Sequence, residues 1–342
     1  MSNDADRVEQ AVQERRDLVN DAIADMLPIQ RPERLYEASR YLLDAGGKRL
    51  RPAVLLLAAE AIEGVEPFAE DYRSFGDEDI DVMAAAVSIE TIQSFTLIHD
   101  DIMDDDDVRR GVPAVHREYD LETAILAGDT LYSKAFECML DTGAPADRTV
   151  RALDELATTC TRICEGQALD VEFEGRESVA PDEYIEMVEY KTAVLYAAAA
   201  SIPAIVLGAD DEVVEALCGY GLDVGRGFQI QDDLLDLTTP SDTLGKQRGS
   251  DLIEGKRTII SLHAREHGVN VDTLVPHERD AVTEDDIDAA LDELDAAGSI
   301  EYAREMAQEY VDRGKNRLEI LPDGEARRTL EAIADYLVER EY

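Results

Sequence analysis

Two short aspartate-rich segments carry the residues best suited to chemistry. Each has the pattern DDxxD, formed by Asp100, Asp101 and Asp104 in the first and by Asp232, Asp233 and Asp236 in the second. On a helix, residues four positions apart lie one turn apart on the same face, so the first and last aspartate of each segment would present two carboxylates together. Magnesium is commonly held by a few carboxylates, with waters and phosphate oxygens completing its coordination. The two segments therefore predict sites at which Mg²⁺ holds a diphosphate.

Acidic residues are so common here that a single DDxxD carries little weight. Asp and Glu number 77 against 33 Lys and Arg, a net charge of -44, and a run of acid is usually a solvated face. Context favours a metal site, because each aspartate pair follows an apolar helical segment. These two segments span residues 82–98 and 222–230. Carboxylates at the end of a buried helix repel one another unless a cation lies between them.

Basic residues gather in a few motifs. The run GGKRLRP at 46–52 combines two glycines with three cations, which is typical of an anion site; an ordinary glycine-ended helix with basic residues is the alternative. Arg109 and Arg110 follow the first aspartate segment, and guanidinium groups suit phosphate oxygens. Only six lysines occur in the chain, and Lys191, Lys246 and Lys256 lie in further motifs. Together these cations indicate a site for two phosphorylated ligands.

Helices must position these residues. Apolar spacing predicts helices over 8–27, 32–43, 53–62, 82–98, 121–140, 150–165 and 303–318, and no alternating strand pattern stands out. The predicted fold class is all-α. No linker rich in Gly, Ser or Pro divides the chain, so a single domain over residues 1–342 is expected. The apolar run at 192–208 is short for a membrane span and predicts a buried helix, with no transmembrane segment.

The acidic charge is spread along the whole chain rather than confined to a tail. Such a chain lacks the basic surface that nucleic-acid binding requires, so no nucleic-acid partner is expected. Evenly spread acid favours a solvated surface and a halophilic cytoplasm as the location. The four cysteines form no CxxC pair and are expected to be small core residues.

In their joint order the motifs resemble the trans-isoprenyl diphosphate synthase family, the farnesyl and geranylgeranyl diphosphate synthases. They are GGKRLRP at 46–52, LIHDDIMDDDDVRRG at 97–111, EGQALD at 165–170, KTAVL at 191–195, GFQIQDDLLD at 227–236, GKQRGSD at 245–251 and EGKRT at 254–258. The resemblance implies a large helical bundle with a central cavity, a homodimer and a Mg²⁺-dependent enzyme with up to three ions per site. Its substrates would be isopentenyl diphosphate and the allylic dimethylallyl, geranyl and farnesyl diphosphates.

The resemblance also implies roles for individual residues. The six aspartates of the two segments would hold Mg²⁺ on the allylic diphosphate, which would be contacted by Arg109, Lys191, Lys246 and Lys256. Isopentenyl diphosphate would be bound by Lys48, Arg51, Arg110 and Gln93, although many family members have His at the position of Gln93. Thr192 and Gln229 would line the site near the developing carbocation, with Gln167 and Asp170 supporting the metal ligands.

Product length is expected to depend on Phe95. This residue lies five positions before Asp100, about 7.5 Å along a helix, where a large aromatic ring can form a floor for the growing chain. The resemblance is to the archaeal geranylgeranyl type, so the predicted product is mainly geranylgeranyl diphosphate, with farnesyl diphosphate as intermediate or co-product. The alternative is that Phe95 is a plain core residue.

Three other functions compete with chain elongation. Terpene cyclases share the first aspartate motif but usually carry an Asn/Ser/Glu motif as the second, whereas this chain has DDLLD. A non-catalytic subunit of a synthase would tend to lose the aspartate motifs. An acidic helical protein without a ligand would not bind magnesium when a diphosphate is added.

Overall fold

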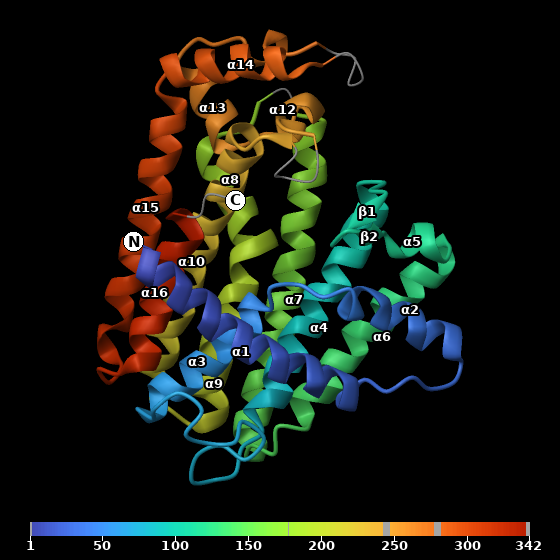
Figure 1. The fold of residues 1–342 in the computed structure, drawn as a ribbon, viewed down its shortest axis with the longest axis vertical. Coiled ribbons are helices and arrows are strands. Elements are labelled where there is room, and N and C mark those ends of the chain that lie inside the picture. Colours follow the sequence, from blue (N-terminus) through green and yellow to red (C-terminus); the bar gives the residue numbers. More distant parts are fainter. Residues whose placement is uncertain (1, 177, 242–246, 277–281, 340–342) are drawn as a thin grey trace. The chain divides into compact units, whose positions relative to one another are not determined.

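The computed structural model describes residues 2–176, 178–241, 247–276 and 282–339, and it confirms the all-α fold (Figure 1). The helices before the second aspartate segment are α1 Ser2–Met26, α2 Glu33–Asp44, α3 Leu50–Glu63, α4 Val82–Met103, α5 Val115–Glu118, α6 Leu121–Leu140, α7 Ala146–Glu174, α8 Pro181–Val188 and α9 Val194–Leu207. A π-helix, η1 Glu189–Ala193, joins α8 to α9.

The second aspartate segment lies on α10 Asp211–Thr238. The later helices are α12 Ser250–Glu254, α13 Ile259–Glu266, α14 Glu284–Ala296, α15 Ser299–Arg317 and α16 Glu325–Glu339, with the short 3₁₀ helices η2 Val271–Thr273 and η4 Leu318–Ile320. The strands of the described residues are β1 Val108–Arg109 and β2 Val112–Pro113, which form one antiparallel pair.

By internal contacts the chain forms two compact units. The first unit comprises Met1–Cys160, Leu195–Cys218 and Leu318–Ala332, and the second comprises Thr161–Val194, Gly219–Arg317 and Ile333–Tyr342. Each unit is described by itself below. The single domain over residues 1–342 stays a prediction.

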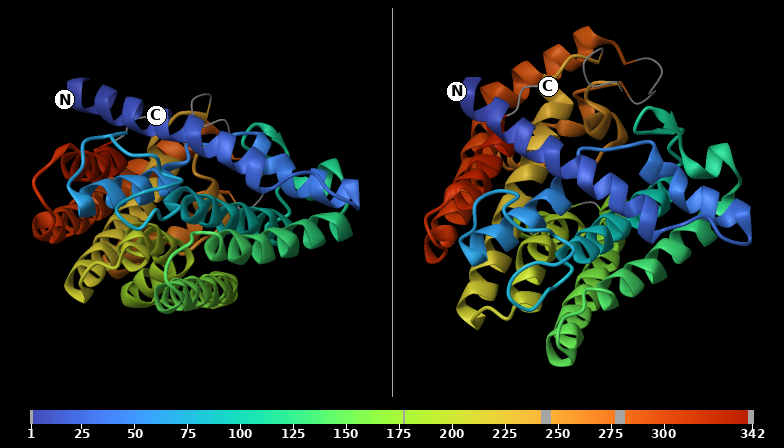
Figure 2. Two further views of the ribbon diagram at one scale, coloured as in Figure 1. Left: turned by 90° about the horizontal axis from the view of Figure 1, so that it is seen from below. Right: turned by 60° about the horizontal axis from the view of Figure 1, so that its bottom comes forward.

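Helix α4 forms the centre of the first unit. It is apolar on nearly all sides, as expected for a helix buried all round, and it packs against α3 and along α6. Helix α1 crosses α3 and α4 (Figure 2). The side chain of Asp81 caps α4 by accepting a hydrogen bond from the Ala84 N–H at 2.8 Å, and Asp120 caps α6 by accepting one from the Thr123 N–H at 2.7 Å.

The second unit packs α13 against α8, α14 and α15. Its core includes Tyr184 of α8, Ile230 and Leu234 of α10, and Ile259 of α13. Ile230 precedes the second aspartate segment and Leu234 lies within it, so the same helix supplies core contacts and the predicted metal ligands.

The predicted helices are confirmed, with most of them longer than expected. Helix α4 continues into the first DDxxD and ends at Met103, with Asp104 as its C-cap, and α7 extends well beyond both predicted ends. The β1–β2 pair had no strand signal because each strand has only two residues. The prediction that every cysteine is a core residue is wrong for Cys164, which is exposed at a solvent-facing position of α7.

Two apolar helical stretches, Val82–Met103 and Pro181–Leu207, are long and apolar enough to cross a membrane. In these stretches 72% and 83% of the most apolar window is buried within the protein. Helices at the core of a folded protein meet the same criteria, so they are weak evidence for membrane insertion.

Candidate functional site

The first acidic site, Asp100, Asp101 and Asp104, lies at the C-terminal end of α4. The Asp104 N–H donates to the Asp100 carbonyl at 2.8 Å, so these two residues are one helical turn apart as expected. Asp101 is buried and Asp104 is exposed. The motif therefore runs from the interior of the first unit to its surface.

Asp101 carries an unsatisfied buried oxygen. Its Oδ1 accepts a hydrogen bond from Arg109 Nε at 2.6 Å, whereas its Oδ2 has no hydrogen-bond partner in the structure. Burial raises the pKa of Asp101, and the Arg109 guanidinium opposes that shift. A hard cation would satisfy Oδ2 and stabilise the ionised carboxylate, so the donor set fits Mg²⁺.

A tight hairpin brings Arg109 to this carboxylate. Arg109 of β1 pairs with Val112 of β2, and the two residues between them, Arg110 and Gly111, have φ of 53° and 76°. Two positive φ values in a two-residue loop are typical of the turns that match strand twist. Arg109 also contacts Asp106 at 2.8 Å, so the guanidinium predicted to bind diphosphate lies among aspartates.

The basic loop at 46–52 is held by a buried carboxylate that sequence analysis missed. Glu90 of α4 accepts hydrogen bonds from Arg49 Nη1 at 2.5 Å and from Arg110 Nη2 at 3.2 Å. Arg110 Nη1 also donates to the Gly46 carbonyl at 2.5 Å, and a Cβ on Gly47 would lie 2.9 Å from the Arg110 guanidinium carbon. The φ of 138° at Gly47 favours glycine, and the close approach of Arg110 adds to that preference. A lone Glu in an apolar helix was the available signal.

Arg110 thus has a structural role within the first unit in addition to the predicted contact with isopentenyl diphosphate. The loop that it holds carries Lys48, which is exposed, and Arg51, whose guanidinium stacks 4.2 Å from the Tyr196 ring centroid. Arg51 Nε is buried without a hydrogen-bond partner. Gln93 is half-buried on α4.

Phe95 lies on α4 among aromatic rings. Its ring makes edge contacts with His99 at 4.9 Å and with Tyr132 of α6 at 5.4 Å between centroids. His99 Nε2 lies 3.2 Å from the Ile125 carbonyl. His99 therefore packs and hydrogen-bonds between α4 and α6.

The second acidic site, Asp232, Asp233 and Asp236, lies within α10, and a cavity of about 100 Å³ adjoins it. The cavity walls bring together six residues that sequence analysis assigned to the site: Asp170, Lys191, Thr192, Gln229, Asp233 and Lys256. Lys246 lies outside the described residues.

Hydrogen bonds connect these side chains in a chain of contacts. Thr192 Oγ1 donates to Gln229 Oε1 at 2.9 Å, and Gln229 Nε2 donates to Asp233 Oδ1 at 3.1 Å. Lys191 Nζ donates to Asp170 Oδ2 at 2.5 Å. Lys256 Nζ lies 3.2 Å from Glu254. The cations predicted to bind diphosphate are thus held near carboxylates.

Asp233 is deeply buried against a tyrosine. The Tyr184 hydroxyl donates to Asp233 Oδ2, a contact that sequence analysis missed and for which the sequence offered no signal. Burial, together with the carboxylate of Asp251, raises the pKa of Asp233 well above its usual range. A bound cation would lower that pKa and relieve the electrostatic cost.

Asp236 has the character of a structural residue. Its Oδ1 accepts from Ser250 Oγ at 2.7 Å and its Oδ2 from the Asp251 N–H at 3.1 Å. These bonds tie the start of α12 to α10. The predicted direct role of Asp236 in holding Mg²⁺ stays a prediction.

Gln167 of α7 is buried with neither amide atom hydrogen-bonded. It belongs to the EGQALD motif with Asp170. Among the described residues no three His, Cys, Asp or Glu side chains already converge as a metal cluster. Ions bound here would therefore draw part of their coordination from waters and substrate oxygens, as Mg²⁺ commonly does.

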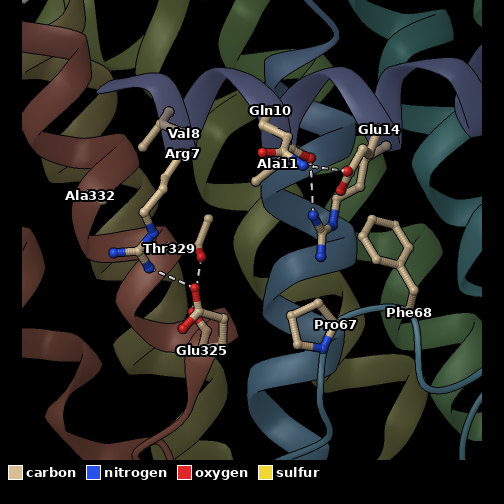
Figure 3. Close-up of a pocket in the computed structure, with 11 residues that line it drawn as sticks. Arg7, Val8, Gln10, Ala11, Glu14, Pro67, Phe68, Glu325, Thr329 and Ala332 are labelled. Carbon is tan, nitrogen blue, oxygen red and sulfur yellow. Dashed lines mark hydrogen bonds and ion pairs between the residues drawn. The ribbon is translucent and has the colours of Figure 1, made fainter. Parts of the chain in front are cut away.

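The first unit also contains a larger cavity, of about 220 Å³, between α1, α16 and the segment at Pro67 and Phe68 (Figure 3). Its polar lining is paired internally, with Arg7 bonded to Glu325 at 2.6 Å and Gln10 to Glu14 at 2.9 Å. None of the motifs of the sequence analysis lines it.

Known proteins match this chain over most of its length. The family model described as "Polyprenyl synthetase" matches residues 32–294. A geranylfarnesyl diphosphate synthase of Natronomonas pharaonis is 71% identical, with 99% of each chain covered. A geranylgeranyl diphosphate synthase of Methanosarcina mazei is 51% identical, with 97% of each covered. The solved geranylgeranyl pyrophosphate synthetase of Geoglobus acetivorans superposes with a TM-score of 0.86 at 45% identity, covering 96% of this chain and 99% of that one.

Proposed function

We propose that this chain joins isopentenyl diphosphate to dimethylallyl, geranyl and farnesyl diphosphates and makes mainly geranylgeranyl diphosphate. The chain belongs to the polyprenyl synthetase family. The observation that carries the proposal is that each acidic site has basic side chains beside it that are suited to binding a diphosphate. Arg109 contacts Asp101 in the first unit, and Lys191 and Lys256 line the cavity with Asp233 in the second.

Up to three Mg²⁺ ions per site, when bound, would offset the negative charge that develops on the departing diphosphate. Asp100, Asp101 and Asp232 would hold them through carboxylate oxygens. Arg109, Lys191 and Lys256 would bind the diphosphate and stabilise it as the allylic C–O bond breaks.

Lys48, Arg51 and Arg110 would orient isopentenyl diphosphate, whose double bond attacks the allylic carbocation and forms the new C–C bond. One proton then leaves the carbon next to the new cation, and the released diphosphate accepts it. Thr192 and Gln229, already hydrogen-bonded to each other, would present oxygen dipoles to the cation. The chemistry requires no protein nucleophile.

A C25 product, geranylfarnesyl diphosphate, is the second candidate, because that is the name of the 71% identical relative from Natronomonas pharaonis. The two candidates differ by one isopentenyl addition. Product analysis separates them: the protein is incubated at high KCl with labelled isopentenyl diphosphate, Mg²⁺ and each starter of C5, C10 or C15. A C20 main product supports the proposal and a C25 main product supports the second candidate. A folded protein that elongates no starter contradicts both, and favours a non-catalytic subunit.

Phe95 gives the same assay a structural test. We expect Phe95→Ala to lengthen the main product by at least one C5 unit, because the ring that blocks the growing chain is removed. Phe136→Ala is the matched control, since Phe136 packs on Tyr132 without an aromatic contact to Phe95. An unchanged product distribution in Phe95→Ala would assign Phe95 to the core alone.

We propose a homodimer that assembles through α6. Leu121, Ile125, Leu126 and Tyr132 are exposed along this helix, although large apolar side chains are usually covered when they occur in a row. Light scattering at high KCl is expected to give twice the chain mass of 37.8 kDa. The double substitution Ile125→Asp and Leu126→Asp is expected to give the monomer mass, and a wild-type monomer would contradict the proposal.

We propose that the enzyme works in a cytoplasm of high salt. The chain has 77 acidic and 33 basic residues, so its negative charges repel one another. Salt screens that repulsion. The expected result is a rise in both activity and thermal midpoint between 0.1 and 2 M KCl. A midpoint that falls over this range would contradict the assignment.

A further inference from the structure

Two residues that carry the predicted chemistry lie on an unusual turn. Lys191 and Thr192 belong to η1, where the Val194 N–H bonds to the Glu189 carbonyl and closes a π-type turn. Such turns are wider and less well packed than α-helical ones and often occur at functional sites. The turn therefore needs support from neighbouring elements to hold both side chains in place.

Helix α7 supports one side of this turn. A Cβ on Gly166 would lie 2.2 Å from the Lys191 backbone nitrogen, so the two backbones touch at a position where only glycine fits. The EGQALD motif thus contains its glycine for a packing reason. This contact restrains the backbone of η1 from the α7 side.

An ion pair supports the turn from α10. Arg226 Nη2 pairs with Glu189, the first residue of η1, and Arg226 Nη1 pairs with Asp223 at 3.0 Å. Arg226 is one helical turn before Gln229, which accepts the hydrogen bond from Thr192. The side chains are 16% exposed for Arg226, 23% for Glu189 and 1% for Asp223, so solvent screens these pairs only partly.

Neutralising Asp223 does not require Arg226. Two residues of α15 also pair with that carboxylate: Arg317 Nε lies 2.9 Å from Oδ2, and Arg313 Nη2 contacts Oδ1. Because Arg313 and Arg317 also neutralise Asp223, the contact that only Arg226 provides is the ion pair with Glu189. Asp223 in turn links Arg226 to the two arginines of α15.

We propose that Arg226 is a positioning residue for the reaction, which pairs with Glu189 to hold the η1 turn so that Lys191 and Thr192 face the allylic diphosphate. The inference rests on the proposed function, and it adds an ion pair between Arg226 and Glu189, two residues that do not touch the substrate, as the support for residues that do. It predicts a defect in binding the allylic substrate and in the rate of its ionisation, with isopentenyl diphosphate binding intact.

The experiment measures kcat, and KM for each substrate separately, in Arg226→Gln, Glu189→Gln and the double variant. Each single substitution is expected to lower kcat/KM for the allylic diphosphate roughly tenfold to a hundredfold, because small misplacements of binding groups carry large kinetic costs. KM for isopentenyl diphosphate should stay at the wild-type value. The double variant should be no worse than the worse single variant, since both break one contact. Arg226→Lys should recover part of the loss.

Arg313→Gln is the matched control, because it removes a guanidinium from Asp223 without touching Glu189. It is expected to lower the thermal midpoint and to leave both KM values unchanged. Lys191→Ala tests the premise and should raise KM for the allylic substrate at least as much as Arg226→Gln. Wild-type kinetics in Arg226→Gln, or additive losses in the double variant, would overturn the inference even if Lys191→Ala behaves as expected. Wild-type kinetics in Lys191→Ala would overturn the premise and the inference together.

Discussion

The two acidic sites share one sequence pattern but have different surroundings. The first lies at the end of α4, where Asp101 is buried, Asp104 is exposed and the counter-charge is Arg109 from the following hairpin. The second lies inside α10, where Asp233 and Asp236 are 5% and 2% exposed. Its buried oxygens accept hydrogen bonds from neutral donors, among them a tyrosine, a glutamine and a serine.

This difference shows that spacing alone does not assign a carboxylate its role. The i, i+4 geometry places two carboxylates on one helix face in both sites, yet neighbouring donors decide which oxygens are left for a cation. At the first site the last aspartate is at the surface, and at the second it holds the start of α12. Equivalent positions of the motif should therefore respond differently to the same substitution.

The largest effect is expected where both sites should behave alike. Asp100→Asn and Asp232→Asn should each lower kcat roughly 10²- to 10³-fold, comparable to the loss of one transition-state stabilising group, because each removes a ligand of Mg²⁺. Rates measured over a Mg²⁺ titration provide the test. Asp292→Asn, an exposed aspartate of α14, is the control and should retain the wild-type rate. A wild-type kcat in either of the first two variants would remove that site from the chemistry.

A smaller effect should separate the last aspartates of the two motifs. Asp236→Ala leaves the Ser250 hydroxyl and the Asp251 N–H without their acceptor in a buried region, which should destabilise the protein by about 1–3 kcal/mol. Asp104→Ala at an exposed position should leave the thermal midpoint nearly unchanged. Denaturation of both variants without Mg²⁺ compares them directly. Equal midpoints would show that Asp236 is not a structural residue.

The smallest effect concerns pH. Because burial raises the pKa of Asp233 above its value in the unfolded chain, the ionised group lowers the free energy of unfolding. This cost is absent below the unfolded pKa, grows as the pH rises and is complete above the folded pKa. Asp233→Asn should therefore stabilise the Mg²⁺-free protein more at pH 8 than at pH 5, by about 1.4 kcal/mol for each unit of pKa shift expressed over that range.

Thermal midpoints in EDTA at both pH values measure this effect. Asp101→Asn is the comparison, since the Arg109 guanidinium opposes the rise in the pKa of Asp101 that burial causes. At Asp233 the hydrogen bonds that oppose the rise in pKa come from the neutral side chains of Tyr184 and Gln229. We expect the pH-dependent gain to be larger in the Asp233 variant. The reverse order would mean that Tyr184 and Gln229 stabilise the ionised form of Asp233 better than Arg109 stabilises Asp101.

Much of the helical fold could be predicted from the sequence, because apolar spacing is a local signal and the packed structure keeps the helices that this signal predicts. Helix α6 was predicted at its observed ends, Leu121 and Leu140, where Asp120 supplies a cap. The convergence of Lys191, Thr192, Gln229 and Lys256 on one cavity followed from their motifs. The tie from Tyr184 to Asp233 did not, because the two residues are 49 positions apart and only tertiary packing brings them together. Similarly, the role of Glu90 depends on two arginines from distant loops.

The π-turn affects the register of the helix that contains it. Residues 181–207 form one continuous helical stretch, and the wide turn at Glu189–Ala193 amounts to one residue more than a regular helix would need. Deleting a single residue within it would restore regular winding, but the remaining residues of the turn would be redistributed around the helix axis and Lys191 would leave the axis in a different direction. A chain shortened by that one residue could keep a fully wound helix and still present its lysine to the wrong neighbours.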